Sequence, residues 1–225
     1  MLKYLVAGMF GLSIAFSSQA ALVEVFSEDF ESSLDDWTTV GNQPILTSDA
    51  FEGAQSVNTD RGFIYNDFAL QAGDVISVWT KFSGEGRSYL GFGATDAGTN
   101  SFVLSSNTQD YRFQDNPDFG FTELNITTFS VLFDTWYRLE VVLGTSEVVG
   151  KVYDTDGTTL LGSLTQDVGS LGALDGGISL RTFGDSANVL DLLQVFRDDS
   201  IAVSSPAGIS VFAAFCIALV FRRKS

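Results

Sequence analysis

Apolar and polar side chains alternate along much of this 225-residue chain. In the segment 74–82, Ile76, Val78 and Phe82 fall on one side of an extended strand, and Trp79 falls on the other. A repeat of two residues is typical of a β-strand, whose successive side chains point to opposite faces of a sheet. The same alternation predicts further strands at Tyr89–Phe92, Ser101–Ser106, Trp136–Leu143, Glu147–Tyr153, Thr159–Leu164, Gly177–Phe183 and Val189–Phe196.

Turn signals separate these predicted strands. Glycine occurs with aspartate, serine or alanine at 72–74, 83–86, 96–98 and 154–157, and these residues favour chain reversals. Because the body of the chain shows no helical repeat of any length, we predict an all-β fold, a two-sheet antiparallel β-sandwich of the jelly-roll type. Its expected core contains Ile76, Val78, Phe82, Leu139, Val141, Ile178 and Leu180.

The chain begins with the pattern of a secretory signal peptide. Lys3 supplies a positive charge, residues 5–16 are apolar, and Ser18 and Ala20 are the small residues of a cleavage site. We therefore expect signal peptidase to cut between Ala20 and Ala21 and the remaining chain to be exported.

The chain ends with a short apolar run and a basic cluster. A helix over residues 207–221 would be about 22 Å long, against about 30 Å of bilayer hydrocarbon, so it would be a marginal transmembrane anchor. Arg222, Arg223 and Lys224 would remain cytoplasmic by the positive-inside rule. We expect the inner membrane to hold the chain in transit while the body lies outside the cytoplasm.

The segment Val203-Ser204-Ser205-Pro206-Ala207, followed by this short helix and the basic cluster, resembles a PEP-CTERM sorting signal. The resemblance implies that an exosortase, a transpeptidase-like enzyme, cuts near Pro206 and passes the protein to the cell surface or extracellular matrix. The family's usual Pro-Glu-Pro is reduced here to Pro206, and an uncleaved C-terminal anchor is the alternative. The expected order is a leader (1–20), a sandwich domain (21–198), a linker with the sorting motif (199–206), a helix (207–221) and a basic tail (222–225).

Several segments of the body resemble the concanavalin A-like (laminin G-like) jelly rolls. They are Glu28-Asp29-Phe30-Glu31, Leu34-Asp35-Asp36-Trp37, Thr135-Trp136-Tyr137-Arg138-Leu139-Glu140, the hairpin at 152–158, Gly176-Gly177-Ile178 and Val189-Leu190-Asp191-Leu192-Leu193. The resemblance implies that the first and last strands lie near one another. A galactose-binding-like jelly roll, which opens similarly, is the alternative fold.

The body is strongly acidic and contains no histidine. The leader has one of the 12 Lys and Arg residues and the tail has three, while all 28 Asp and Glu residues lie between them, so the body's net charge is near −20. Such a charge repels nucleic acid. The absence of histidine removes the commonest general base, and the Glu-x-Asp-x-x-Glu spacing of concanavalin A-like glucanases is also absent. We therefore expect no catalytic activity.

A structural calcium site is one interpretation of three acidic residues. Asp191 shares a predicted strand face with Val189 and Leu193. If that face points into the core, the carboxylate needs a partner, because an unpaired buried charge costs several kcal/mol. Asp29 or Glu31 on the neighbouring first strand could then share a Ca²⁺ with it. If the opposite face is the inner one, Asp191 is solvated.

The segment 107–121 is predicted to be a long loop that binds a glycan. Tyr111, Phe113, Phe119 and Phe121 would offer flat faces to sugar rings, and neighbouring polar groups would bind hydroxyls. The candidate ligand-binding residues are Tyr111, Arg112, Phe113, Asp115 and Asn116. The alternative is a loop packed down by its own aromatic side chains.

These features predict an exported, surface-sorted and non-catalytic sandwich protein. It would associate with extracellular polysaccharide or a biofilm matrix and bind glycan weakly. A purely structural or adhesive surface protein is the first alternative, and a glycan-active enzyme that needs only two carboxylates is the second.

Overall fold

The computed structural model describes residues 21–184 and 188–198, which form two antiparallel β-sheets. Sheet A contains, in order across the sheet, β13 (Leu160–Asp167), β12 (Glu147–Tyr153), β11 (Trp136–Leu143), β6 (Val75–Lys81), β15 (Val189–Asp198), β4 (Ser56–Asn58) and β3 (Ile45–Thr47), with β1 (Leu22–Glu28) also paired to β15. Sheet B contains β10 (Thr122–Thr128), β9 (Asp110–Pro117), β8 (Gly98–Ser105), β7 (Gly86–Thr95), β14 (Gly177–Gly184), β5 (Phe63–Asn66) and β2 (Thr38–Val40). The predicted two-sheet antiparallel sandwich is confirmed.

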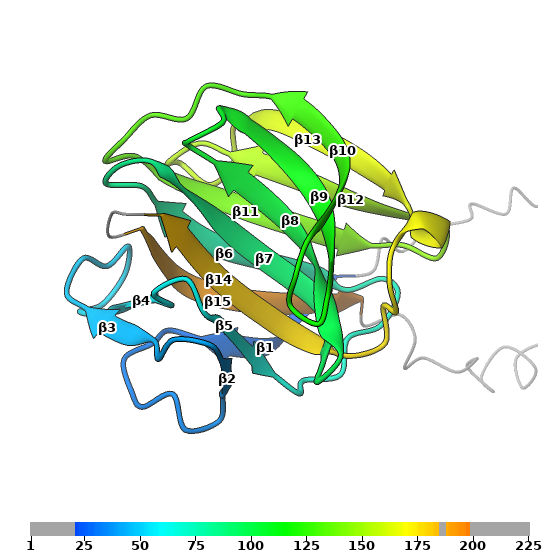
Figure 1. Ribbon diagram of the computed structural model, residues 1–225, viewed down its shortest axis with the longest axis horizontal. Helices are drawn as coiled ribbons and strands as arrows, with labels where there is room; N and C mark the ends of the chain where they lie inside the picture. Colours follow the sequence, from blue (N-terminus) through cyan, green and yellow to red (C-terminus); the bar gives the residue numbers. More distant parts are fainter. Residues whose placement is uncertain (1–20, 185–187, 199–225) are drawn as a thin grey trace, which may run out of the picture. The chain divides into compact units, whose positions relative to one another are not determined.

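The last two strands complete the two sheets. Figure 1 shows β7 to β10 in the green part of the chain, and the later strands β14 and β15 in yellow and orange. Strand β14 lies between β7 and β5, and β15 pairs with β6, β4 and β1. The first and last strands are therefore neighbours, as the resemblance implied, and neither sheet is complete until the end of the domain is present.

The core lies between the sheets and is rich in aromatic rings. All seven predicted core residues are buried, each with 0 % of its surface exposed. Phe102 also lies there, and its ring passes over the main chain of Gly150 on the opposite sheet. A Cβ at position 150 would lie 2.3 Å from the Phe102 ring, so only glycine allows this close approach of the sheets.

A β-bulge interrupts the alternation of β15. The register shifts between Asp191 and Gln194, where Leu192 adopts a left-handed φ of 46°. As a result Leu190 and Leu193 both face the core, while Asp191 lies on the other side of the sheet. The alternation in the sequence predicted a regular strand with Asp191 facing either the core or the solvent. Neither regular strand is observed, because a bulge moves one residue out of the two-residue repeat.

The acidic hairpin between β12 and β13 is an ordinary turn. The main-chain N–H of Asp154 donates to the oxygen of Thr159 at 3.0 Å, and Gly157 donates back to Asp154 at 2.8 Å. Asp156 accepts bonds from the Thr159 hydroxyl and from the N–H groups of Thr159 and Thr158, and these bonds lower the pKa of Asp156 to about 2. The carboxylate thus stabilises the turn.

The predicted leader and tail lie outside the described residues. This applies to the cleavage site at Ala20, to Pro206, and to the basic cluster of Arg222, Arg223 and Lys224. Within 21–184 and 188–198 no helix has the length and hydropathy needed to cross a membrane. The described strands belong to one compact unit, Leu22–Asp198.

Candidate functional site

The outer face of sheet B carries two parallel rows of side chains. Strand pairing places Phe63, Arg181, Tyr89, Val103 and Arg112 in one row across five strands. The adjacent row contains Tyr65, Ser179, Gly91, Ser101 and Gln114. Side chains on one face of a strand repeat every second residue, about 6.6–6.8 Å apart, so the two rows are adjacent. Tyr65 and Arg181 are partly exposed, and the other residues of the two rows are buried.

Arg112 is held in a closed hydrogen-bond network. Its guanidinium pairs with Asp110, with Glu123 at 2.6 Å and with the Thr108 hydroxyl at 2.7 Å. Burial acts to lower the pKa of Arg112, but hydrogen bonds and charge from Asp110 and Glu123 outweigh it, and the pKa is raised. The donors of Arg112 are therefore already used within the protein.

Arg181 has a different environment on the same face. Its guanidinium carbon lies 4.7, 5.1 and 5.0 Å from the ring centres of Phe63, Tyr89 and Phe183. Its Nε donates to the main-chain oxygen of Arg61 at 3.0 Å, and the described residues offer its two Nη atoms neither a carboxylate nor another acceptor. Burial lowers the pKa of Arg181. The positive charge is thus partly desolvated, and no carboxylate of the described residues pairs with it.

A hollow of about 410 Å³ lies beside Tyr65. Asp67, Thr95 and Asp96 also line it, together with main chain around the start of β14. The ring of Phe119, from the turn between β9 and β10, stacks on Tyr65 with centres 5.9 Å apart and planes 24° apart. The hollow therefore combines a flat aromatic surface with carboxylate and hydroxyl oxygens.

Hydroxyl groups form the floor between this hollow and Arg181. The Oγ of Ser179 lies 2.9 Å from the Oγ1 of Thr99, and Ser101 donates to Asn116 at 2.8 Å. The first pair meets over Gly91, where a Cβ would lie 1.8 Å from the Ser179 oxygen. Glycine at this position is what allows the two hydroxyls to join neighbouring strands.

The structure corrects the prediction of a glycan-binding loop at 107–121. Most of this segment is the strand β9, paired with β8 and β10. Tyr111 and Phe113 are 5 % and 0 % exposed and pack against Phe102, with ring centres 5.9 and 5.2 Å away. Because their faces are buried in the core, the prediction that they stack on sugar rings is wrong.

The other predicted ligand-binding residues lie on both sides of β9. Arg112 and Asn116 are on the outer face of sheet B, and Asp115 faces the inner side at one end of the sandwich. There it lines a separate hollow of about 210 Å³. Of the aromatic residues in the predicted loop, Phe119 is the one that reaches the surface beside Tyr65. The segment 107–121 thus contributes side chains to the outer face of sheet B, but these do not include the buried rings of Tyr111 and Phe113.

Neither Arg181 nor Tyr65 was predicted from the sequence to be a site residue. The signal for Arg181 was present, since alternation in the predicted strand Gly177–Phe183 opposes it to Ile178 and Leu180. Alternation along a strand predicts on which face of the sheet a side chain lies. It does not predict which side chains of other strands lie beside it. The rings beside Arg181 come from strands far away in the sequence, so the site is visible only when the strand order is known.

The predicted calcium ligand Asp191 binds main chain instead. Its Oδ2 accepts hydrogen bonds from the N–H groups of Phe51 at 2.7 Å and Glu52 at 3.0 Å, and its Oδ1 accepts one from Leu192 at 2.8 Å. Burial, with a contribution from the charge of Glu31, raises the pKa of Asp191 against these three bonds. The carboxylate is 1 % exposed and fixes the 49–55 loop to sheet A.

The other two predicted calcium ligands have similar partners. Glu31 accepts from the N–H groups of Ala54 at 2.6 Å and Gln55 at 2.8 Å, and Asp29 accepts from the N–H of Glu31 at 3.1 Å. Within the described ranges, no group of three or more acidic, cysteine or histidine side chains is arranged to hold a metal ion. In this structure the three carboxylates accept hydrogen bonds from main-chain N–H groups, and a calcium ion shared by them stays a prediction.

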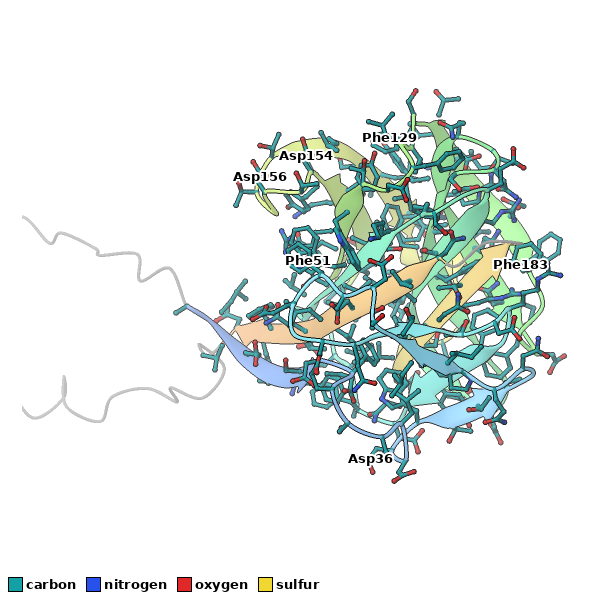
Figure 2. All side chains as sticks on the ribbon, turned by 90° about the vertical axis from the view of Figure 1, so that its left-hand side faces the viewer. Asp36, Phe51, Phe129, Asp154, Asp156 and Phe183 are labelled. Carbon is teal, nitrogen blue, oxygen red and sulfur yellow. The ribbon has the colours of Figure 1, made fainter. Side chains whose placement is uncertain are left out.

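The opposite face of the sandwich has an aromatic cluster of its own. Phe51 stacks on Trp79 with centres 3.7 Å apart, and the edge of Trp136 lies 5.6 Å from Phe51. Figure 2 shows Phe51 on one side of the molecule and Phe183 on the other. The loop that Asp191 fixes covers Trp79, which is 7 % exposed.

A larger cavity, of about 600 Å³, lies at one end of the sandwich. Aliphatic side chains such as Leu70, Leu143 and Leu174 line it. Its lining contains no aromatic ring and no basic group. It therefore lacks the stacking and charged groups that the outer face of sheet B combines.

No protein-family model and no curated protein matches this chain, but solved structures match its fold. A Bacillus subtilis protein of unknown function with a galectin-like fold gives a TM-score of 0.56 at 12 % identity, covering 77 % of this chain and 96 % of that one. The carbohydrate-binding module CBM66 from Bacillus subtilis gives 0.50 at 16 % identity, covering 72 % and 92 %. The exoplasmic/lumenal domain of VIP36, in a form bound to Ca²⁺ and Man3GlcNAc, gives 0.54 at 14 % identity, covering 84 % and 94 %.

These identities establish a shared fold and nothing finer. The fold is the galectin-like and lectin jelly roll, which agrees with the predicted concanavalin A-like class. The likeness does not test the predicted leader or sorting signal.

The role of Asp191 can be tested by Asp191→Ala. The partly buried N–H groups of Phe51 and Glu52 lose their acceptor, and leaving a buried donor unpaired costs about 1–3 kcal/mol. We expect the free energy of unfolding to fall by about 1–3 kcal/mol in urea titrations followed by tryptophan fluorescence. Asp36→Ala, which removes an exposed carboxylate, is the control and should change it by less than about 0.5 kcal/mol. Equal effects of the two substitutions would show that Asp191 does not fix the loop.

Proposed function

We propose that this protein is a non-catalytic glycan-binding module whose ligand lies on the outer face of sheet B. The observation that carries the proposal is the hollow beside Tyr65, whose row of side chains lies next to the row of Arg181 on the same face of sheet B. Aromatic faces pack against the C–H faces of sugar rings, and planar polar groups bind hydroxyls.

The size and chemistry of the hollow support this function. Its volume of about 410 Å³ falls within the range of about 300–1,000 Å³ typical of small-molecule sites. Asp67 and Asp96 provide acceptors for sugar hydroxyls, and Thr95 can both donate and accept. Two proteins of similar fold are a carbohydrate-binding module and a domain in complex with Man3GlcNAc, which makes the same class of ligand a reasonable proposal here.

The proposal of a binding rather than a catalytic role rests on the sequence. There is no histidine in the chain, and no strand carries the alternating carboxylates of related glucanases. Asp67 and Asp96 are the carboxylates at the hollow, and we assign them to hydroxyl recognition. Release of reducing ends from any polysaccharide that the protein binds would contradict this assignment.

Replacing Tyr65 by Ala tests where the glycan lies. We expect binding to an array of bacterial exopolysaccharides to fall about tenfold or more, because the stacking surface and its buried area are lost. The matched control is Tyr153→Ala, since Tyr153 is also partly exposed on a strand but lies on the outer face of sheet A. If the control loses binding and Tyr65→Ala keeps it, the ligand is on the opposite sheet.

We further propose that the chain is exported and sorted to the bacterial surface, where glycan binding would hold it in the extracellular matrix. Support comes from the sequence: the leader that ends at Ala20, Pro206 before a short apolar run, and the basic cluster at 222–224. An exosortase-type enzyme and signal peptidase are the proposed partners. An uncleaved anchor with an adhesive role is the alternative.

Deletion of residues 204–225 tests the sorting proposal. The truncated chain should fold with an unchanged thermal midpoint, since strand β15 ends at Asp198, and should appear in the periplasm or the medium. Fractionation with immunoblotting measures its location. Its arrival at the same surface site as the full chain, or its misfolding, would contradict a sorting role for the segment.

A further inference from the structure

We propose that the glycan carries an acidic substituent, a carboxylate or a sulfate, which Arg181 binds. This inference rests on the proposed function, because it specifies the ligand of the same face. It follows from what surrounds Arg181 and from how the other basic residues of the domain are used.

Basic residues in this domain are paired as a rule. Lys81, Arg87, Arg112, Arg138, Lys151 and Arg197 each lie within 4 Å of a carboxylate oxygen. The body has 28 acidic residues and eight basic ones, so a cation has many carboxylates from which to find a partner. Arg181 nevertheless has none among the described residues.

Arg181 is partly exposed, and its two Nη atoms have no acceptor among the described residues. The rings of Phe63, Tyr89 and Phe183 surround the group, and Arg61 accepts only from its Nε. The two Nη atoms form a planar fork that matches the two oxygens of a carboxylate or sulfate. Burial, with a contribution from the charge of Arg87, lowers the pKa of this side chain.

The fork lies within reach of a glycan that occupies the hollow. Arg181 is two residues from Ser179 on the same face of β14, a spacing of about 6.6–6.8 Å, and Ser179 pairs with Tyr65. A sugar stacked at Tyr65 could therefore place a substituent, or the next sugar of the chain, beside Arg181.

The surrounding charge limits how acidic the glycan can be. Asp67 and Asp96 line the hollow, and the body as a whole has a net charge near −20. A polymer with an acid on every sugar would be repelled from these carboxylates. The environment instead fits a mainly neutral glycan with isolated acidic groups, spaced so that one meets Arg181 while neutral sugars fill the hollow.

The test uses the full chain in detergent and three immobilised polysaccharides. Gellan has a single uronate in its repeat, carboxyl-reduced gellan has the same backbone without charge, and alginate is a uronate at every residue. We expect the protein to bind gellan about tenfold or more tightly than either of the others, the difference typical of a charge-assisted hydrogen-bonded pair.

Variants then assign that preference to Arg181. Arg181→Gln should lower gellan binding to the level of the carboxyl-reduced polymer and leave binding to that polymer unchanged, while Arg181→Lys should be intermediate. The control is Arg87→Gln, the same charge change on the same face at a residue 3.9 Å from Glu123, and it should alter binding less than about twofold. Thermal midpoints within the error of the wild type establish that the variants are folded.

The outcomes separate the two proposals. If the wild type binds gellan and its reduced form equally, or if Arg181→Gln weakens both alike, the acidic-ligand inference is wrong while glycan binding stands. Binding to neutral dextran or levan, with none to gellan, leads to the same conclusion. If the protein binds no polysaccharide, the proposed function itself fails.

Discussion

The structure depends on one constraint, which is that two sheets share a single core. Each strand must give every second side chain to that core, so the residues left outside are fixed by the same alternation. In β14, Ile178 and Leu180 are fully buried, and Ser179 and Arg181 are placed outside as a consequence. The outer face of sheet B is therefore determined by the packing between the sheets, and its binding chemistry is built on the remaining positions.

The sequence predicted the fold where alternation and composition agreed. Ile76, Val78 and Leu139 are apolar residues in clear two-residue repeats, and all are buried. In β9 the two signals disagreed. Tyr111 and Phe113 alternate with polar residues as in a strand, but the polar content of the segment suggested a loop. Arg112, Gln114 and Asn116 lie on the outer face of sheet B, where hydrogen bonds satisfy them, so a polar strand is stable there.

The site itself was less predictable because it is assembled from distant segments. Phe63, Tyr89 and Arg181 are neighbours only because β14 enters sheet B between β5 and β7, and nothing in the local pattern gives that order. Asp191 shows a different limit. Its environment depends on a bulge at Leu192, a local backbone choice that moves one residue out of the repeat. The neighbours of Arg181 thus depend on the order of strands in sheet B, and the environment of Asp191 depends on the bulge in β15. Neither could be predicted from the local sequence pattern.

The central claim is that sheet B, and not sheet A, presents the glycan-binding face. A titration of the ¹⁵N-labelled protein with gellan oligosaccharides, followed by amide chemical shifts, tests it most directly. The account predicts shifts concentrated in β5, β7 and β14, including Tyr65 and Arg181, and little change in β11 and β12. Shifts concentrated around Trp136 and Tyr153 on the opposite sheet would contradict it.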